Sequence, residues 1–390
     1  MMNRIYLDYS ATTPPDPQVI EAMVALFGSS YGNASSVHSF GREARANLEQ
    51  SRDRVAHWIG ARSDEVFFTS GGTEADNHAV KGLALAGARI GKNEIITSAA
   101  EHHAVLHPVE SLRKAGFDVK LLSVDKFGQL DPDEVKKAIS SKTAVISLML
   151  ANNEVGSINK IDEIAAIARE ASVPIHSDTV QAMGKIKVDV DRLGLDALSI
   201  SAHKFYGPKG IGAIYIRKGT RIEPFMEGGS QESNRRAGTE NVPLAAGFAK
   251  AAELAESRLD EDHEKILGLR KKLMARLTSE FTGLLLNGHE TECLPHILSV
   301  SFDSFVTPLD GDAIIMGLDL EGIAVTSGSA CTSGSLQASH VLLAMGRDER
   351  TARATVRFSI GRLTTEQEIN FAADALKRVV ERVAKAGTGR

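Results

Sequence analysis

The sequence contains few cysteine and aromatic residues and no long apolar stretch. Aromatic residues make up 5% of the 390 residues, and the two cysteines are Cys293 and Cys331. Two cysteines cannot form a disulfide framework or a cysteine-rich metal site, so we expect no bound metal. The longest apolar runs, such as residues 143–151, are too short to cross a bilayer.

Charge of one sign is not concentrated in the chain. The net charge is −5 and no block of lysine and arginine stands out, so we expect no nucleic-acid partner. Residues 1–9 lack the apolar core of a signal peptide, which predicts a cytoplasmic protein with no membrane partner. The 43% of hydrophobic and 24% of charged residues are typical of a soluble globular protein, and the length suggests about two domains.

Apolar runs alternate with helical patterns between residues 65 and 217. The predicted strands are 65–70, 94–98, 118–124, 144–152, 174–178, 197–201 and 212–217, and the predicted helices between them are 73–86, 104–115, 131–139 and 161–170. This alternation predicts an α/β fold with a mostly parallel sheet. Ligands of such sheets bind beyond the carboxyl ends of the strands, so the residues that follow each strand are the candidates for a site.

The second part of the chain has a different pattern. Residues 244–280 predict one long, highly charged helix of the kind that often bridges two domains. Beyond it the sequence predicts a smaller α+β domain, with strands at 296–302 and 354–360, helices at 310–320, 337–345 and 365–384, and a mobile Gly- and Ser-rich loop at 327–335.

Three strand ends carry side chains that could bind a planar, phosphorylated ligand. Gly72 and Thr73 begin a helix directly after a strand, where free backbone N–H groups suit a phosphate, although an ordinary capped turn has the same pattern. His102 follows the second strand and could stack on a ring, move protons or cap a helix. Asn153 follows the fourth strand, where an amide can bind a ring substituent or form a turn.

Asp178 and Lys204 are the strongest candidates. Asp178 ends an apolar strand, where a buried carboxylate needs a cation or strong donors; a helix N-cap is the alternative. Lys204 follows another strand, with Ser201 and His203 just before it. A lysine in a cleft can form a Schiff base when burial lowers its pKa, whereas most single lysines are exposed. Together, this Lys, this Asp and the Gly-Thr turn fit a pyridoxal 5'-phosphate site.

Seven segments in the same order along the chain resemble the NifS/IscS-type cysteine desulfurases. They are Tyr-Leu-Asp-Tyr-Ser-Ala-Thr-Thr-Pro (6–14), Gly-Asn-Ala-Ser-Ser (32–36), Ser-Gly-Gly-Thr-Glu (70–74), Asn-Asn-Glu-Val-Gly (152–156), His-Lys (203–204), Gly-Thr-Glu-Asn (238–241) and Ser-Gly-Ser-Ala-Cys-Thr (327–332). The resemblance implies fold type I of the pyridoxal phosphate enzymes, in which a large domain with a mostly parallel seven-stranded sheet joins a smaller α+β domain. We expect the large domain at 15–260 and the small domain at 1–14 with 261–390.

The resemblance also implies a role for each candidate residue. Lys204 would bind the cofactor aldehyde, Asp178 the pyridine nitrogen and Gln181 the ring hydroxyl, with His102 stacked on the ring and moving protons. Gly72, Thr73, Ser201 and His203 would hold the phosphate, joined by Thr239 from the partner subunit of a homodimer. Asn153 would contact both cofactor and substrate, and Arg357 would bind the substrate carboxylate with its planar fork, instead of forming a surface ion pair.

Cys331 would select the reaction. Glycines and serines surround it, which favours an accessible thiol over the buried structural cysteine that is the usual alternative. By resemblance, its thiolate would take sulfur from L-cysteine as a persulfide and leave L-alanine. Cys293, just before Leu-Pro, fits the structural type and receives no role.

The expected function is therefore cysteine desulfuration, with delivery of sulfur to an acceptor or iron–sulfur scaffold protein whose identity the sequence does not reveal. A selenocysteine lyase, a class V aminotransferase and a non-catalytic sulfur-relay protein are the alternatives. Ala34 and Thr179 depart from the usual Pro and Ala of the family. Many members also extend beyond the position of Arg390 with a segment that helps to dock the scaffold, so scaffold docking stays open.

Overall fold

The computed structural model describes residues 4–328 and 337–387. The strands of its largest sheet are β2 (Val66–Thr69), β3 (Glu94–Ser98), β4 (Asp118–Leu122), β5 (Thr143–Ser147), β6 (Ile175–Asp178), β7 (Ala197–Ser201) and β8 (Gly212–Ile216). They lie in the order β2-β8-β7-β6-β5-β3-β4; β8 is antiparallel to β2 and β7, and the other neighbours are parallel. The mostly parallel seven-stranded sheet predicted from the sequence is confirmed.

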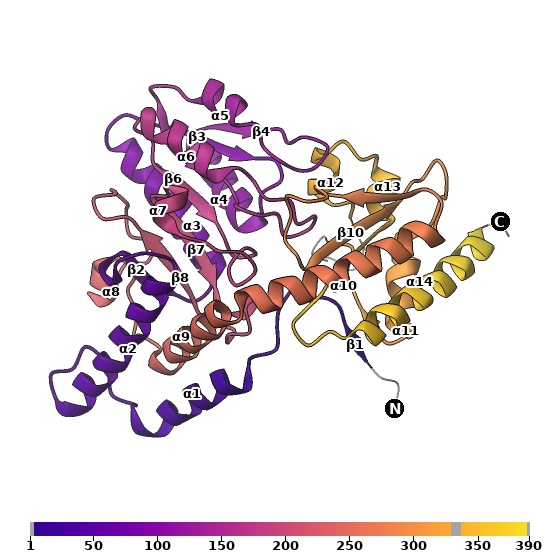
Figure 1. Ribbon diagram of the computed structural model, residues 1–390. Coiled ribbons are helices and arrows are strands. Elements are labelled where there is room, and N and C mark those ends of the chain that lie inside the picture. Colours follow the sequence, from indigo (N-terminus) through magenta and orange to yellow (C-terminus); the bar gives the residue numbers. More distant parts are fainter. Residues whose placement is uncertain (1–3, 329–336, 388–390) are drawn as a thin grey trace.

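Helices cover both faces of this sheet (Figure 1). They are α1 (Pro17–Ser29), α2 (Ser39–Trp58), α3 (Gly72–Ala88), α4 (His103–Lys114), α5 (Pro132–Ala138), α6 (Ile161–Glu170), α7 (Val190–Leu193), α8 (Gln231–Asn234) and α9 (Val242–Ser257). Phe67 lies in the core formed with α3 and α4, and Phe68 in the core formed with α2, α6 and α9. Because successive strand residues point to opposite faces, these apolar strands are buried on both sides.

The long helix predicted at residues 244–280 is wrong as a single element. The structure has two helices there, α9 and α10 (Leu259–Glu280), which are separated by Arg258. Arg258 has φ −110° and ψ 6°, outside the helical region, and its guanidinium donates to Asp16 at 3.2 Å. No Gly or Pro marks this break, and a tertiary contact accompanies it. Helices α1 and α2 were not predicted at all.

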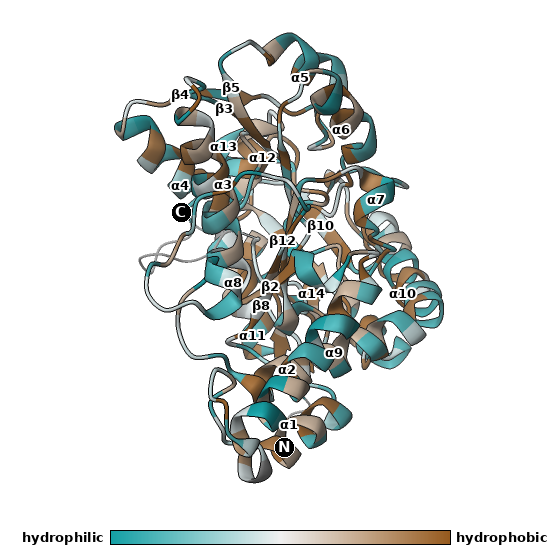
Figure 2. Ribbon diagram, turned by 90° about the vertical axis from the view of Figure 1, so that its left-hand side faces the viewer, coloured by the Kyte–Doolittle hydropathy of each residue, from teal (hydrophilic) through white to brown (hydrophobic). Residues whose placement is uncertain are grey.

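A second, smaller domain contains an antiparallel sheet in the order β12-β10-β9 and a short parallel pair, β1 with β11. Its elements are β1 (Ile5–Tyr6), β9 (Leu284–Asn287), β10 (Ile297–Phe302), α11 (Gly311–Leu320), β11 (Ile323–Ala324), α12 (His340–Ala344), α13 (Glu349–Arg353), β12 (Thr355–Ser359) and α14 (Glu366–Gly387). The predicted elements of this domain are present, whereas β1, β9, β11 and α13 were missed because they are short. Brown, hydrophobic residues are seen in strands β2, β8 and β10 in Figure 2, and helix α10 carries teal, hydrophilic residues on its outer side.

The N-terminal segment packs with the C-terminal part of the chain. Ile5 and Leu7 share one core with Phe302 and Phe358, while α10 extends across both parts of the molecule (Figure 1). The packing of the N-terminal segment with the C-terminal part is consistent with a small domain built from both ends of the chain. The domain boundaries, between residues 14 and 15 and between residues 260 and 261, stay a prediction.

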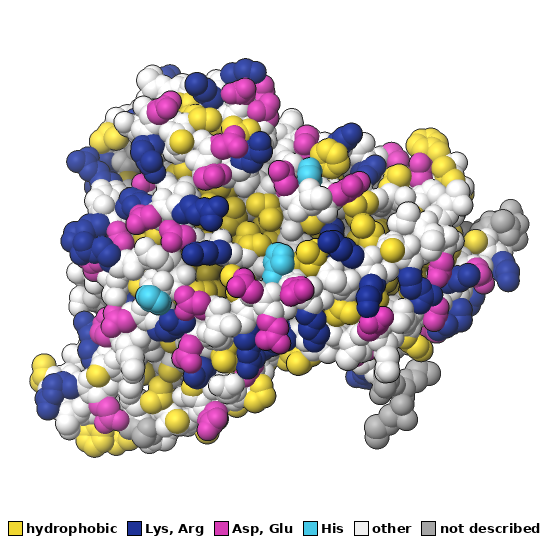
Figure 3. Space-filling view, viewed as in Figure 1, with side chains coloured by type: hydrophobic (Ala, Val, Ile, Leu, Met, Phe, Trp, Pro, Cys, Tyr) yellow, Lys and Arg dark blue, Asp and Glu magenta, His cyan; other side chains and the backbone are white. Residues whose placement is uncertain are grey.

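Surface charge is mixed on the face drawn in Figure 3, where Lys and Arg side chains alternate with Asp and Glu. Within the described ranges, none of the helices has the length and apolar character needed to span a membrane.

A buried ion pair between Arg52 and Glu232 generates the first prediction. Two hydrogen bonds, of 2.6 and 2.9 Å, join the side chains, and Glu232 also accepts from the backbone N–H of Phe68. Glu232→Ala removes the buried partner of the guanidinium and leaves it only the half-exposed Glu49 (3.0 Å) and the Val66 carbonyl (2.8 Å). We therefore expect the free energy of unfolding, measured by urea denaturation, to fall by about 3 kcal/mol, the lower end of the range for a broken buried pair.

The matched control is Glu366→Ala. Glu366 pairs with Lys272 at 2.6 Å, but both side chains are more than half exposed. Its loss should cost at most about 1 kcal/mol. Equal losses for the two variants would contradict the importance of the buried pair.

Candidate active site

One cavity of about 620 Å³ collects most of the predicted site residues. It lies at the carboxyl ends of β2, β6 and β7, and the N-terminal segment and β12 complete its wall. The predicted residues that line it are Gly72, Thr73, His102, Asn153, Asp178, Gln181, Ser201, His203, Lys204 and Arg357. We call it the central cavity. The position of these residues agrees with the rule that ligands bind beyond the carboxyl ends of parallel strands.

Two predicted residues do not line the central cavity within the described chain. Thr239 lines a neighbouring pocket with Glu232 and Arg236, and the two pockets share Ser70. Cys331 and most of the predicted mobile loop 327–335 lie outside the described residues.

The N-terminus of α3 forms one end of the central cavity. By helix geometry, the first backbone N–H groups of α3 have no acceptor within the helix, so they are available to an anion. A Cβ on Gly72 would lie 2.8 Å from Val180 Cγ2 and 3.3 Å from Ser201 Cβ, so only glycine lets the helix start approach β7 this closely. The carboxylate of Glu74 accepts from the Ser70 N–H and binds Arg236, which ties the segment that carries Thr239 to this helix start.

His203 lies on the same side of the site. Its Nδ1 is 3.1 Å from the Thr12 hydroxyl, and burial lowers the pKa of His203 to about 4. The ring is therefore neutral at pH 7 and can offer a hydrogen bond without adding a charge. Together with Thr73 and Ser201, it forms a polar cradle of the size and chemistry that a phosphate requires.

Lys204 lies in the centre of the site. It ends the 3₁₀ turn Ala202–Lys204 that follows β7, and its Nζ donates to the backbone carbonyls of Ser10 (2.7 Å) and Ala11 (2.9 Å). Burial, together with the cation of Arg357 and against the carboxylate of Asp178, lowers the pKa of Lys204 to about 8. The alternative of an exposed turn lysine is wrong. A large fraction of neutral amine exists near pH 8, as a nucleophilic lysine requires.

Asp178 is buried at the end of β6, and its Oδ1 accepts from the backbone N–H of Val180 at 2.9 Å. Burial raises the pKa of Asp178 to about 6. A cationic ring nitrogen in the cavity would stabilise the carboxylate. No helix begins in the described residues directly after Asp178, so the residue fits a pyridinium partner better than the alternative role of a helix N-cap.

Asp76, in the first turns of α3, is a cavity residue that the sequence analysis missed. Burial and the charge of Asp178 raise the pKa of Asp76 well above its usual range. The signal in the sequence is its spacing: it lies three residues after Thr73, on the same helix face.

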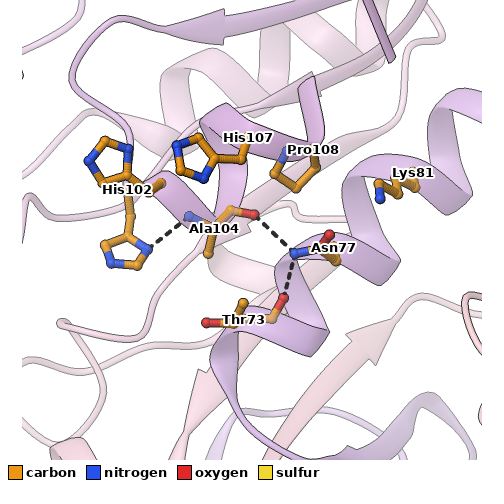
Figure 4. Close-up of a pocket in the computed structure, with 8 residues that line it drawn as sticks. Thr73, Asn77, Lys81, His102, Ala104, His107 and Pro108 are labelled. Atoms are coloured by element: carbon orange, nitrogen blue, oxygen red, sulfur yellow. Dashed lines mark hydrogen bonds between the residues drawn. The ribbon is translucent and has the colours of Figure 1, made fainter. Parts of the chain in front are cut away.

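His102 performs the capping role and also lines the cavity. As the N-cap of α4, its Nδ1 accepts from the backbone N–H of Ala104 at 3.1 Å, so the ring proton resides on Nε2. Burial lowers the pKa of His102 to about 4, which keeps the ring neutral. Figure 4 shows this contact and the adjoining pocket of about 390 Å³, where Asn77 bridges the backbone carbonyls of Thr73 and Ala104.

Arg357 is buried on β12 and does not form the surface ion pair of the alternative interpretation. Its guanidinium donates to the backbone carbonyl of Asn153 (2.8 Å) and to the carboxylate of Asp8 (3.0 Å), while its Nε has no partner among the described residues. Asp8 also lines the cavity. A guanidinium has five N–H donors in a planar fork, and the two hydrogen bonds described here leave donors that are suited to bind a carboxylate ligand.

Comparisons with known proteins show the family of this chain. The family model for class-V aminotransferases matches residues 5–371. The chain belongs to the class-V aminotransferase family. Among its relatives, the cysteine desulfurase IscS of Dictyoglomus turgidum is 48% identical over 98% of this chain and 96% of its own length. The cysteine desulfurase IscS of Methanosarcina thermophila is 43% identical over 97% of this chain and 92% of its own length.

Solved structures of similar proteins have the same fold. A NifS-like protein superposes with a TM-score of 0.90 at 36% identity and covers 97% of this chain and all of its own. A structure of SspA in complex with cysteine has a TM-score of 0.81 at 33% identity, and the match covers 93% of this chain and 100% of that one. The resemblance to NifS/IscS-type proteins expected from the sequence is confirmed, and class-V aminotransferases are pyridoxal phosphate-dependent enzymes.

The lowered pKa of Lys204 generates the second prediction. Acetylation by acetic anhydride, followed by mass spectrometry of the apoprotein, should show Lys204 reactivity that rises through a midpoint near pH 8. Arg357→Gln should shift this midpoint to higher pH, because removal of a cation favours the ammonium form. Asp178→Asn should shift it to lower pH, because removal of a carboxylate disfavours it.

Exposed Lys187 serves as the internal control for the reagent. Shifts of Lys204 in the same direction for both variants would show that the two charges do not set its pKa.

Proposed function

We propose that this class-V enzyme is a cysteine desulfurase, which binds pyridoxal 5'-phosphate, converts L-cysteine to L-alanine and takes up the sulfur on Cys331. The observation that carries the proposal is that three groups line the same cavity. They are an amine with a pKa of about 8 (Lys204), a buried carboxyl (Asp178) and a guanidinium with a free donor (Arg357). The IscS relatives support the choice of reaction.

The donor set fits pyridoxal phosphate from end to end. The start of α3, with Gly72, Thr73, Ser201 and His203, holds the phosphate; Lys204 binds the aldehyde; Asp178 accepts from the ring nitrogen. When bound, the cofactor supplies a protonated ring that accepts the electron pair of the reacting amino acid. Gln181 donates to the Ser10 carbonyl at 2.8 Å, and the second N–H of its amide would be the donor for the ring hydroxyl oxygen.

Arg357 and Asn153 bind the carboxylate of L-cysteine. Because the Arg357 fork contacts Asp8 and its Nε is buried, the substrate carboxylate replaces the Asp8 carboxylate. The exchange of one carboxylate for another conserves the ion pair, so substrate binding leaves no buried cation without a partner.

Lys204 and His102 carry out the proton transfers. The Lys204 amine, with its pKa near 8, accepts a proton from the substrate and returns it, and neutral His102, which lines the cavity, offers the proton on its Nε2. A base whose pKa is close to the working pH is efficient in both directions.

The sulfur step needs no external oxidant. The Cys331 thiolate attacks the substrate sulfur, an S–S bond forms, and the C–S bond breaks, with its electron pair left on the carbon that becomes the methyl group of alanine after protonation. The two sulfur atoms are oxidised to a persulfide and the substrate carbon is reduced. A reductant or an acceptor protein then removes the terminal sulfur.

We further propose a homodimer in which Thr239 of each subunit binds the phosphate in the partner's site. Thr239 lies outside the central cavity of its own chain, while Arg236 ties its segment to the adjacent helix start, which supports an exchange between subunits. The proposed setting is the cytoplasm, with a sulfur-acceptor or iron–sulfur scaffold protein as the partner.

The third prediction concerns the products. Purified protein with pyridoxal phosphate, L-cysteine and dithiothreitol should release alanine and sulfide in equal amounts, measured by amino-acid analysis and methylene blue. Sulfide with pyruvate would mean β-elimination and would contradict the role of Cys331. Neither product would favour an aminotransferase or a non-catalytic relay, and a strong preference for selenocysteine would favour a lyase.

The fourth prediction uses the two cysteines as a matched pair. Cys331→Ser should abolish sulfide release, because its hydroxyl cannot take up sulfur, while the cofactor absorbance persists. Cys293→Ser is the control: Cys293 is buried and its Sγ lies 3.5 Å from the Glu290 carbonyl, so its loss should leave turnover unchanged. Full activity in the Cys331 variant would refute a persulfide on this residue.

A further inference from the structure

A second buried lysine lies beside the site and has no role in the function described so far. Lys185 follows β6 and is 5% exposed. Among the described residues, no carboxylate oxygen lies within 4.0 Å of its Nζ. Burial of an ammonium without an ion pair costs free energy. A lysine at this position therefore suggests a role that requires a hydrogen-bond donor or a charge.

Lys185 contacts the backbone of the residue that bears the reactive amine. Its Nζ donates to the backbone carbonyl of Lys204 at 3.2 Å and lies 5.3 Å from the centre of the Tyr206 ring. Its own backbone carbonyl is 3.2 Å from Nδ1 of His263 on α10. Lys185 thus connects the 3₁₀ turn of Lys204 to the helix that extends across both domains.

Side chains add to the backbone hydrogen bonds that hold this turn. Thr13 donates to the carbonyl of His203 at 2.9 Å and accepts from the N–H of Tyr206 at 2.7 Å. Tyr206 has the left-handed φ of +66°, which is unfavourable for a residue with a side chain. The guanidinium of Arg362 lies 4.0 Å from the centre of its ring. A strained turn persists only where its surroundings determine it, and Lys185 supplies the contact to the carbonyl of Lys204 itself.

Charged groups from several elements surround Lys185. Asp262 of α10 favours its ammonium form, while Arg362 and Lys204 oppose it, and the buried His296 before β10 is affected by the same charge. Burial lowers the pKa of Lys185 to about 8. A methionine of similar length would avoid this cost but would donate no hydrogen bond.

We propose that Lys185 is a positioning residue for Lys204: its hydrogen bond to the Lys204 carbonyl, together with Tyr206, sets the direction in which the Lys204 side chain leaves the turn. This inference rests on the proposed function, because it assigns Lys204 as the amine that binds pyridoxal phosphate. Lys185 touches neither cofactor nor substrate, since it does not line the central cavity.

The fifth prediction compares Lys185→Met, Lys185→Gln and the exposed control Lys187→Met. In Lys185→Met, the apoprotein should capture pyridoxal phosphate on Lys204 about tenfold more slowly, measured by borohydride reduction and peptide mass spectrometry, because a small displacement of a reacting group slows its reaction. kcat for cysteine should fall about tenfold or more while KM is unchanged, because Arg357 and Asn153 are untouched.

Two comparisons separate positioning from stability. Lys185→Gln keeps an N–H donor without the charge and should recover part of the capture rate. The urea midpoint of Lys185→Met should not fall, because an unpaired buried charge has been replaced by an apolar group. A lowered midpoint with a wild-type capture rate and kcat in the folded protein would overturn the inference.

A different measurement shows whether the proposed function itself fails. In that case the wild-type protein does not incorporate pyridoxal phosphate at Lys204. Even then, acetic anhydride labelling of Lys204 still tests the inference, because a displaced amine in Lys185→Met must change its labelling rate. An unchanged rate in that assay would overturn it.

Discussion

Two backbone carbonyls of the N-terminal segment complete the site. The Ser10 carbonyl accepts from both Lys204 and Gln181, and the Ala11 carbonyl accepts a second hydrogen bond from Lys204. These contacts join a segment whose neighbours pack in the smaller domain to the strand ends of the large sheet. They also give the Lys204 amine two hydrogen-bond acceptors, so the amine is satisfied without an ion pair.

Burial is the common cause of the electrostatic properties of the site. It lowers the pKa of Lys204 toward neutrality, keeps His102 and His203 uncharged, and raises the pKa values of Asp178 and Asp76. Asp178 and Lys204 are the groups whose pKa values, about 6 and about 8, lie closest to neutral pH. A group whose pKa is close to the working pH can both take up and release a proton, which suits a reaction that moves several protons in sequence.

Much of the fold could be predicted because strands buried on both faces have continuous apolar sequences, and the strand ends marked Thr73, His102, Asp178 and Lys204 directly. The elements that could not be predicted have no local signal. Arg258 ends α9 without Gly or Pro, and β1 and β11 are two-residue strands formed by a pairing far apart in the chain. Asp8 was missed because its contact with Arg357 joins distant positions in the sequence, whereas Asp76 had a local signal, its spacing from Thr73, but its electrostatic neighbour Asp178 is distant.

The sequence alone determined the family, the class of sheet and the identity of the groups available for chemistry, because these depend on residue type and on short spacings. Only the tertiary structure decided which of those groups are buried, what each one contacts and how its pKa is displaced. The physical reason is that desolvation and hydrogen bonding depend on atoms brought together by long-range packing. Lys185 illustrates the difference: in the sequence it is one lysine among many, and in the fold it is a buried ammonium bound to the backbone of Lys204.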